Sequence, residues 1–461
     1  MNSEALYLKL PIPLQNAACS LVGWCIQRSR FGPGFYEQLR QYEERARWSH
    51  DRMHSYRDQR LAQFIRHCAA TVPYYRDLFR ELDIAPECIV TLDDLAKLPI
   101  LTKPVVQKRY PDLLSAAVPP HQRIITHTSG TTGGGLRFAV TLAAIQEQWA
   151  AWWRYRRMHG LTLDTWSAHF GGRLVVPLAQ KRPPFWRYNR PGRQILFSGY
   201  HLSPATMRLY VDELNRRRPP WWHGYPSILA LLAGFVLETR SRLAYQPRWI
   251  TIGAENLLSQ QVDLIERAFG VRPIEHYGMA EACANVSQCP RGRLHVDEDF
   301  AATEFVPSPA GGCKVVGTNF TNPATPLLRY DAGDVVQPSD ESCDCGLPGR
   351  TLRRIDGRKE DYVILRNGAR LGRMDHIFKD LMAIREAQIY QNQPGVIIVR
   401  IVKNPSYTER FEGLLKAEFY KRVGDEAEVR VEYVDNIART VTGKLRLVVS
   451  DIKDGQIVTD S

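Results

Sequence analysis

The segment Thr128-Ser129-Gly130-Thr131-Thr132-Gly133-Gly134-Gly135 decides how the rest of this chain is interpreted. An apolar pair at 124–125 precedes it and an alternating stretch at 136–140 follows it, which predicts a strand, a loop and a second strand. Glycines let backbone N–H groups approach an anion because no Cβ blocks them, and the hydroxyls add donors for phosphate oxygens. Neither a lysine nor a helix follows the glycines directly, so this is not a Walker A loop. Taken alone, such a cluster is more often a flexible hairpin tip, and its interpretation depends on the residues downstream.

The composition limits the classes of function. A chain of 461 residues is long for one core and favours two or more domains. Hydrophobic residues make up 44% of it and aromatic residues 10%, which is typical of a globular protein with ample core material. The formal charge of +12 favours anionic partners such as nucleotides, coenzyme A, nucleic acid or a lipid surface. Because the basic residues are spread widely and no nucleic-acid-binding module is present, we predict no nucleic-acid partner.

The cysteines and the apolar segments bear on the compartment. Nine scattered cysteines, an odd number in a chain of this size, argue against a disulfide scaffold and predict a reducing, cytoplasmic location. The longest apolar stretch near the N-terminus, residues 17–26, is interrupted by Gly23 and is too short to span a bilayer. We therefore predict a buried helix there and no transmembrane segment. The oligomeric state stays open, with a homodimer among the options.

Strands alternate with helices along the chain, which predicts an α/β fold with a largely parallel sheet. The region 34–80 is predicted to be helical. Within it, the helix with an apolar stripe of Leu61, Phe64, Ile65 and Cys68 is predicted to end at Val72-Pro73-Tyr74-Tyr75. Strands are predicted at 248–252 and 273–276, an ordered loop at 166–203 and a turn at 221–227. A boundary near residue 356 predicts a large domain, 1–356, and a small α+β domain, 357–461, with strands at 362–365, 396–402 and 429–434.

Several further turns carry side chains that suit a nucleotide. The stretch Tyr277-Gly278-Met279-Ala280-Glu281 follows a predicted strand, where the carboxylate of Glu281 suits Mg²⁺ and the ring of Tyr277 suits a purine. Asp334 follows a glycine turn and suits the two ribose hydroxyls. Arg358 opens the small domain, and Lys444 lies on a glycine turn near its end. Each of these, taken singly, is also what an ordinary polar turn contains.

In this order, however, the segments resemble the adenylate-forming superfamily of acyl-CoA synthetases, and within it the phenylacetate–CoA ligase branch and the CapK-type proteins. The matching segments are the loop at 128–135, 277–281, 330–334, Gly357-Arg358 and Gly443-Lys444. The stretches 183–203 and 222–227 are similar to the CapK-type subgroup. The resemblance covers nearly the whole chain. It implies the adenylate-forming fold, with a large multi-sheet N-terminal domain and a small mobile α+β C-terminal domain.

The resemblance also implies an activity. A carboxylic acid attacks the α-phosphate of ATP to give an acyl-adenylate and pyrophosphate, and a thiol, usually that of coenzyme A, then takes the acyl group. Lys444 and Glu281 are implied as catalytic residues, with Mg²⁺ on Glu281, and Lys444 reaches the site only if the small domain swings about a hinge at Glu360 or Asp361. Phosphate contacts are implied for Thr128, Ser129, Gly130, Thr131, Thr132 and Gly133. Nucleoside contacts are implied for Gly253, Ala254, Glu255, His276, Tyr277, Gly278, Met279, Ala280, Asp334 and Arg358.

Two positions depart from the family pattern and keep other functions open. Gly134 stands where the family often has lysine, and Ala280 stands where it often has threonine. Acyl transfer to an amine or to a carrier protein is one alternative, and a non-catalytic nucleotide-binding scaffold is another. The identity of the acid is not readable, because Phe170, Trp221 and Tyr225 suit an acyl pocket and a core equally well.

Four residues suggest a structural zinc ion. Cys289 and His295 flank one turn, and Cys343 and Cys345 lie on another. Three thiolates and one imidazole fit a closed tetrahedral Zn²⁺ site. From spacing alone, free thiols are an equal alternative, and the rival ligands are Cys283 and Cys313. Some phenylacetate–CoA ligase-like proteins carry zinc at a similar set, and that resemblance favours the metal.

Overall fold

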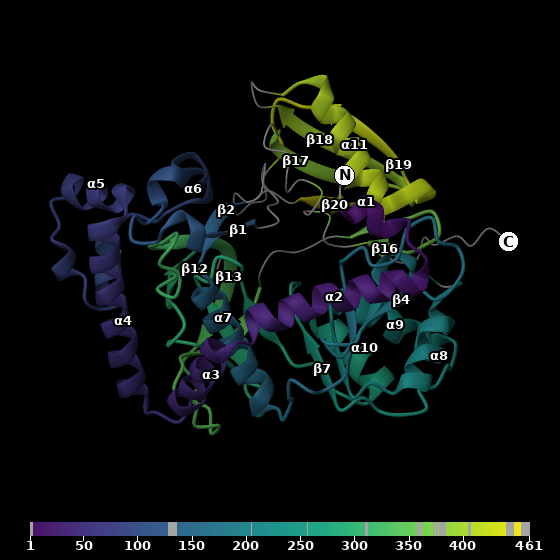
Figure 1. Ribbon diagram of the computed structural model, residues 1–461, viewed down its shortest axis with the longest axis horizontal. Coiled ribbons are helices and arrows are strands. Elements are labelled where there is room, and N and C mark those ends of the chain that lie inside the picture. Colours follow the sequence, from purple (N-terminus) through teal and green to yellow (C-terminus); the bar gives the residue numbers. More distant parts are fainter. Residues whose placement is uncertain are drawn as a thin grey trace.

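The computed structural model describes residues 3–127, 136–203, 205–255, 257–308, 312–356, 362–371, 374, 377, 384–403, 407–438 and 447–452. Helices and several β-sheets share this chain, so the predicted α/β class is confirmed (Figure 1). The helices are α1 (Ser3–Leu8), α2 (Ile12–Arg30), α3 (Pro33–Arg45), α4 (His50–Thr71), α5 (Pro73–Glu81), α6 (Lys103–Arg109), α7 (Leu142–Met158), α8 (Met207–Arg217), α9 (Pro226–Glu238), α10 (Ser259–Phe269) and α11 (Glu409–Val423). Among the described residues, no helix combines the length and apolar character needed to cross a membrane.

The first helices follow the predicted pattern with one correction. The apolar stripe of α4 is buried, and α4 ends at Thr71 because Pro73 cannot continue it and instead begins α5. The helix predicted to be buried, within α2, lies on the surface: Leu21 is 63% exposed and Trp24 47%. The buried positions of α2 are Gln15 and Gly23, a polar and a small residue, whereas Leu14, Leu21, Val22 and Trp24 are exposed.

A five-stranded sheet is formed within residues 167–252. Its order is β4 (Trp186–Asn189), β5 (Gln194–Ser198), β3 (Ser167–Gly171), β6 (Trp221–Gly224) and β7 (Trp249–Ile252). All neighbours are parallel except the edge pair β4 and β5, as the prediction of a largely parallel sheet required. The predictions for 166–203 and 221–227 were wrong, because these segments contain β3, β4, β5 and β6. These strands are short, and His169 and His223 interrupt their apolar runs.

The two faces of this sheet have different neighbours. Ala168, Phe170, Trp222 and Ile250 face one core, which α8, α9 and α10 cover. Side chains alternate along a strand, so the residues between them point to the opposite face. Trp221 lies on that opposite face and packs in a cluster with Trp153 of α7.

A seven-stranded antiparallel sheet adjoins it. Its order is β11 (Ala302–Pro307), β12 (Cys313–Thr318), β13 (Tyr330–Ser339), β14 (Thr351–Ile355), β10 (Leu294–Val296), β9 (Asn285–Gln288) and β8 (His276–Gly278). A bridge between Thr251 and Ile274 connects β7 to the segment that leads into β8. The strand predicted at 273–276 therefore begins later than expected. The predicted strand pair around the glycine-rich loop is present as β1 (Ile124–His127) and β2 (Arg137–Val140), which pair antiparallel.

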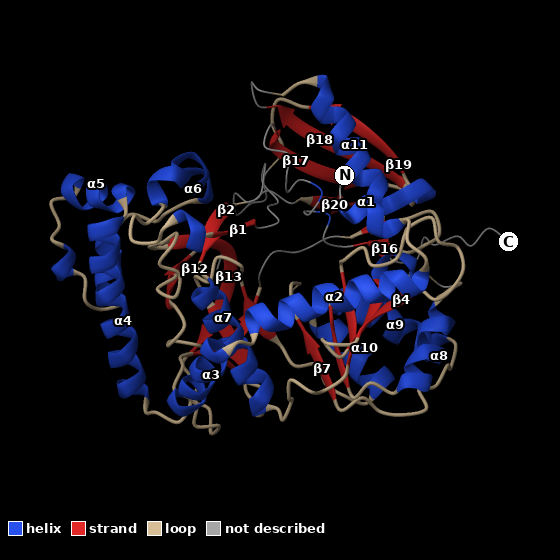
Figure 2. Ribbon diagram, in the orientation of Figure 1, coloured by secondary structure: helices blue, strands red, loops and turns tan. Residues whose placement is uncertain are grey.

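The last part of the chain has its own sheets and its own core. It contains β15 (Val363–Ile364) with β16 (Arg370–Leu371), and a four-stranded sheet ordered β19 (Glu428–Tyr433), β18 (Val396–Lys403), β17 (Ile384–Gln391) and β20 (Val448–Ser450). Figure 1 shows this part in yellow above the two large sheets, and Figure 2 shows that α11 lies against its strands. Tyr200 and the half-buried Leu178 pack on its core, and Lys181 forms an ion pair with Glu426 at 3.4 Å. The predicted strands at 396–402 and 429–434 are confirmed, whereas β17 was not predicted.

Candidate active site

The segment 277–281 forms the tip of a hairpin between β8 and β9. Tyr277 pairs with Val286 and Gly278 with Asn285, after which the chain turns through Ala282, whose φ is +59°. A Cβ on Gly278 would lie 2.8 Å from the side-chain oxygen of Asn285, so glycine is required there. Glu281 is buried at 9% exposure, and its carbonyl accepts a hydrogen bond from the amide of Asn319 at 3.1 Å. The hairpin thus holds the predicted Mg²⁺ ligand on a rigid turn.

Two predicted nucleotide-binding residues are in direct contact. The Tyr277 hydroxyl donates a hydrogen bond to Asp334 Oδ2 at 2.9 Å, although 57 positions separate them in the chain. Asp334 lies on β13, next to Gly333, whose φ is +75°. The contact joins the hairpin of β8 and β9 to the far side of the same sheet. Tyr277, which is predicted to contact the purine, therefore lies against Asp334, which is predicted to contact the ribose.

The segment Gly253-Ala254-Glu255 lies beside this hairpin. It leaves the end of β7, and Ile252 donates its N–H to the carbonyl of Ile274 at 3.1 Å, directly before β8. Ala254 has a left-handed backbone, with φ of +70°. The carboxylate of Glu255 accepts the N–H of Ser227 at 3.1 Å and so caps the beginning of α9.

The flanks of the glycine-rich loop also reach this region. Leu136 and Phe138, at the start of β2, are buried in one cluster with Cys283, and Met279 packs against the same cluster. The side chain of Gln148, on the helix that follows β2, donates to the carbonyl of Met279 at 2.9 Å. The loop itself lies outside the described residues, as do two predicted residues of the small domain. These positions are Thr128, Ser129, Gly130, Thr131, Thr132, Gly133, Arg358 and Lys444.

Sequence reasoning missed a row of polar side chains that crosses the five-stranded sheet. The register pairs His169 of β3 with His223 of β6, and His223 with Thr251 of β7. The rings of His169 and His223 lie 5.1 Å apart, and His223 Nδ1 is 2.8 Å from the Thr251 hydroxyl. This row faces α7 rather than the apolar core. The signal in the sequence was the histidine at the third position of each strand, which was hidden because neither segment was recognised as a strand.

Arg156 of α7 lies among these side chains. Burial and then the charge of Arg156 lower the pKa of His276 to about 3, and burial with the charges of Arg173 and Arg156 lowers the pKa of His169 to about 4. Burial and the neighbouring charges hold the pKa of His223 well below its usual value. All three imidazoles are therefore neutral at pH 7. We call Arg156, His169, His223 and His276 the basic cluster.

The basic cluster continues into the nucleotide-binding segments. His276 directly precedes Tyr277, and its ring stacks on Tyr155 at a centroid distance of 4.4 Å. Asn285, which is buried, is 3.1 Å from His276 Nε2 and accepts the indole N–H of Trp152 at 2.9 Å. A Cβ on Gly253 would lie 3.8 Å from the ring of His223. The cluster is thus contiguous with residues 253–255 and 276–278.

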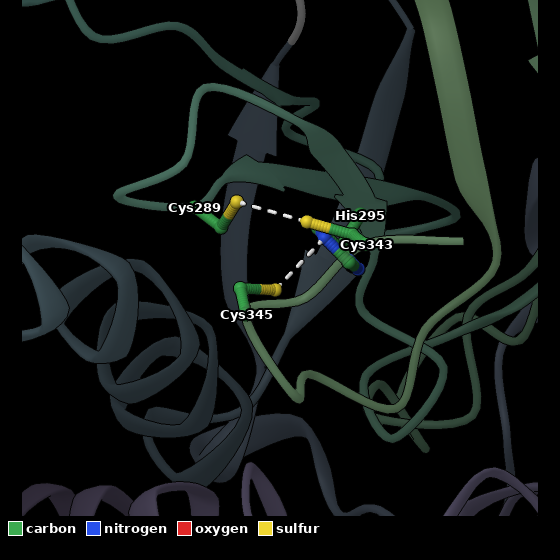
Figure 3. Close-up of side chains that lie close together, drawn as sticks. All are labelled: Cys289, His295, Cys343 and Cys345. Carbon is green, nitrogen blue, oxygen red and sulfur yellow. Dashed lines mark hydrogen bonds between the residues drawn. The ribbon is translucent and has the colours of Figure 1, made fainter. Parts of the chain in front are cut away.

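The four predicted zinc ligands meet at the edge of the seven-stranded sheet. Figure 3 shows their side chains pointing toward one another from the turn after β9, from β10 and from the loop between β13 and β14. Their ligand atoms all lie within 4.8 Å of one another. The sulfurs of Cys289 and Cys343 are 3.8 Å apart, and the sulfur of Cys345 is 3.2 Å from His295 Nε2. Two thiolates on a tetrahedral Zn²⁺, with Zn–S of about 2.3 Å, are separated by about 3.8 Å.

The surroundings fit a metal as well. His295 Nδ1 lies 3.3 Å from the carbonyl oxygen of Gly349. When Nδ1 carries the ring proton and donates it to this oxygen, Nε2 has no proton and faces the sulfurs as a ligand atom. The N–H of Leu347 points to the sulfur of Cys345 at 3.5 Å. The rival ligand Cys283 is buried in a different cluster, and Cys313 lies on β12, outside this group.

Comparison with known proteins gives a consistent relationship. A profile of the CapK C-terminal domain matches residues 365–451. Protein CapK of Staphylococcus aureus is 25% identical over 97% of this chain and 99% of its own length. A phenylacetate–coenzyme A ligase of Thermus thermophilus is 25% identical over 85% of this chain and 84% of its own.

The fold has solved counterparts. The crystal structure of 2-hydroxyisobutyryl-CoA ligase in complex with 2-HIB-AMP and CoA superposes with a TM-score of 0.57, at 19% identity, over 88% of this chain and 91% of that one. This likeness shows that the chain has the adenylate-forming CoA ligase fold, as the resemblance in sequence implied. The relationship to CapK and to phenylacetate–CoA ligases is confirmed as well.

Proposed function

Because this chain is related to CapK and to phenylacetate–CoA ligases and has the adenylate-forming CoA ligase fold, we propose that it activates a carboxylic acid with ATP and transfers the acyl group to coenzyme A. In the first step a carboxylate oxygen bonds to the α-phosphorus of ATP, and pyrophosphate leaves. In the second step the thiol sulfur of coenzyme A bonds to the acyl carbon, and AMP leaves. The contact between Tyr277 and Asp334 carries the proposal, since it joins two motif segments that are distant in sequence.

The physical difficulty of the first step is repulsion between an anion and a polyanion. We assign the phosphates to the N–H groups and hydroxyls of 128–133, the base to Tyr277 and to 253–255, and the ribose to Asp334 and Arg358. Mg²⁺, held by the carboxylate of Glu281, would draw charge from the phosphates. Lys444 would place a positive charge between the two reacting anions.

Three further assignments belong to this proposal. The chain divides into a large domain, 1–356, and a small domain, 357–461, and the small domain swings to bring Lys444 into and out of the site. Coenzyme A, rather than an amine or a carrier protein, is the acceptor, in line with the names of the phenylacetate–coenzyme A ligase relatives. The reaction takes place in the cytoplasm, where ATP and coenzyme A are available.

Carboxylate-dependent exchange of pyrophosphate with ATP tests the first step. We expect exchange with at least one member of a broad acid panel, and thioester formation with that acid when coenzyme A is added. Replacing Lys444 by alanine should slow exchange at least 100-fold, which corresponds to about 3 kcal/mol of barrier. The matched control is Lys416→Ala, which removes a half-exposed lysine of α11 that pairs with Glu412. ATP binding without exchange for any acid would favour the scaffold alternative, for which Gly134 and Ala280 are the sequence arguments.

We also propose that Cys289, His295, Cys343 and Cys345 bind a structural Zn²⁺. A closed set of three thiolates and one imidazole leaves no position for a substrate, so the ion would act by holding chain segments together. It would tie the hairpin that carries 277–281 to the strand that carries Asp334. In this way a metal bound outside the nucleotide-binding segments would support nucleotide binding.

Zinc analysis of the protein purified in metal-free buffer tests this site. We expect one zinc per chain, its loss in Cys343→Ser, and a lower melting temperature in that variant. The control is Cys88→Ser, an exposed cysteine distant from the group in sequence, which should keep both zinc and stability. Wild-type protein without zinc would refute the assignment.

A further inference from the structure

Arg156 is a buried cation for which the described residues supply no carboxylate. Arg156 is 6% exposed, and its Nε is buried without a hydrogen-bond partner. Four aromatic rings surround the guanidinium at 5.3 to 5.8 Å. They belong to Trp149, Trp153, Tyr155 and Trp221. Aromatic faces attract a cation but do not neutralise it, so the positive charge remains available to an anion.

Two further arginines strengthen this charge. Burial, followed by the charges of Arg173 and Arg156, lowers the pKa of Arg30 to about 10. Arg30 is therefore close enough to Arg173 and Arg156 to be repelled by both, and the guanidinium groups of Arg30 and Arg156 both contact the ring of Trp149, at 4.1 and 5.8 Å. No ion pair within the described residues includes any of the three arginines. Arg30 comes from the end of α2 and Arg173 from the segment after β3, so three separate elements bring like charges together. Arg156 is buried, Arg30 is half-buried and Arg173 is exposed. An uncompensated buried charge is costly, and the cost at Arg156 points to an anion that completes the set.

The imidazoles around Arg156 are not fully buried. His169, His223 and His276 each keep partial solvent exposure, although burial depresses their pKa values. As neutral rings they offer N–H donors and ring nitrogens as acceptors. The cluster adjoins 253–255 through His223 and 277–281 through His276. An acid whose reacting carboxylate lies at the nucleotide would extend its other end toward Arg156.

We propose that the acid activated here carries a second negative charge, and that Arg156 binds this charge with the support of Arg30 and Arg173. This inference rests on the proposed function, because it names the substrate class of the same site. The substrate is a short acid whose distal group is a carboxylate or a phosphate. Hydroxyl or carbonyl groups between the two charges would hydrogen-bond to the imidazoles. An acid with a purely apolar tail would leave Arg156 without a counter-ion.

Matched pairs of acids test the class. Each pair keeps the carbon skeleton and replaces a terminal methyl group by a carboxylate: butanoate with succinate, hexanoate with adipate, and 4-methylbenzoate with terephthalate. A further arm, 3-phosphonopropanoate, separates a distal phosphoryl group from a distal carboxylate. In pyrophosphate exchange we expect kcat/KM to be at least 10-fold higher for the charged member of one pair.

Variants of Arg156 distinguish binding from a structural role. Arg156→Gln should raise KM for the charged acid at least 10-fold, with kcat and the KM for ATP nearly unchanged. Arg156→Lys should recover part of the lost affinity, since it keeps the charge. Arg208→Gln, which removes an exposed arginine of α8, should change neither constant. Equal loss with charged and neutral acids would indicate a structural role and overturn the proposal.

Titration calorimetry of succinate and butanoate, without ATP, separates this inference from the proposed function. Arg156-dependent binding of succinate without exchange for any acid would overturn the proposed enzyme activity and keep the anion site. Exchange with neutral acids alone, and no Arg156-dependent binding of a charged acid, would overturn the anion site and keep the enzyme activity. Absence of both exchange and binding would overturn both. Circular dichroism of each variant checks that it folds.

Discussion

Arg154 and Arg156 lie two positions apart on α7, are almost equally buried, and have opposite surroundings. Arg154 is 4% exposed and forms ion pairs with Asp297 at 2.7 Å and Asp299 at 2.9 Å. Arg45 of α3 shares Asp299 at 2.8 Å. Arg156, at 6% exposure, meets aromatic rings and neutral imidazoles instead.

The difference teaches how to separate structural charge from functional charge. A buried ion pair whose partners both come from the chain is complete before any ligand arrives, and it fixes α7 against the loop between β10 and β11. A buried cation that the described chain leaves without a carboxylate is a cost to the fold, and such costs concentrate where function needs them. We therefore assign Arg154 to the fold and Arg156 to the site.

The largest expected effect is on stability, and it should differ between the two arginines. Arg154→Met would leave Asp297 and Asp299 buried without their shared cation, and should lower the free energy of unfolding by about 3–5 kcal/mol. Arg156→Met removes only contacts with aromatic rings, which are worth about 0.5–2 kcal/mol. Urea denaturation followed by circular dichroism measures both. If Arg156→Met costs as much as Arg154→Met, the structure holds a counter-ion for Arg156 and the comparison fails.

The second effect concerns pH. The native pKa values of His169 and His276 are about 4 and about 3, below the ordinary value of 6.5, so the unfolded chain binds more protons between these limits. The free energy of unfolding should therefore fall as pH decreases from 6.5, by about 1.4 kcal/mol per pH unit for each such histidine. Burial raises the pKa of Glu275 to about 7, which opposes this trend between pH 7 and 4.5.

Denaturation at pH 7, 6 and 5 measures this dependence. His169→Asn and His276→Asn should each flatten it, and the exposed His121→Asn should not. If neither substitution changes the pH dependence of the free energy of unfolding, the rings of His169 and His276 are protonated in the native protein. The basic cluster would then carry more positive charge than that of Arg156 alone.

The sequence predicted the part of the site that depends on residue type within a short motif. Cys289, His295, Cys343 and Cys345 were recognisable because few side chains bind zinc, and the structure brings all four together. The sequence predicts that Tyr277 and Asp334 each contact the nucleotide, whereas the hydrogen bond between them follows only from the fold.

The basic cluster could not be predicted, because it depends on pairing between distant strands. His169 and His223 are neighbours only through the register of β3 and β6, and the sequence predicts a loop at one of these strands and a turn at the other. In the sequence, nothing distinguishes Arg154, Arg156 and Arg157, which all lie near the end of the same helix. Only tertiary structure gives Arg154 its aspartates and places Arg157 on the surface beside Glu43, while Arg156 is left among aromatic rings.

The smallest effect we predict compares two Tyr–Asp hydrogen bonds. Tyr277 donates to Asp334 at 2.9 Å, and Tyr390 of β17 donates to Asp451 at 2.8 Å in an exposed contact of the four-stranded sheet. Tyr277→Phe should cost about 1 kcal/mol of stability, because a half-buried carboxylate loses a donor. If Asp334 holds the ribose, Tyr277→Phe should also raise the KM for ATP several-fold. Tyr390→Phe removes the same chemical group and should leave the KM for ATP unchanged. Equal KM values for ATP in both variants would mean that the hydrogen bond between Tyr277 and Asp334 stabilises the sheet and does not contribute to nucleotide binding.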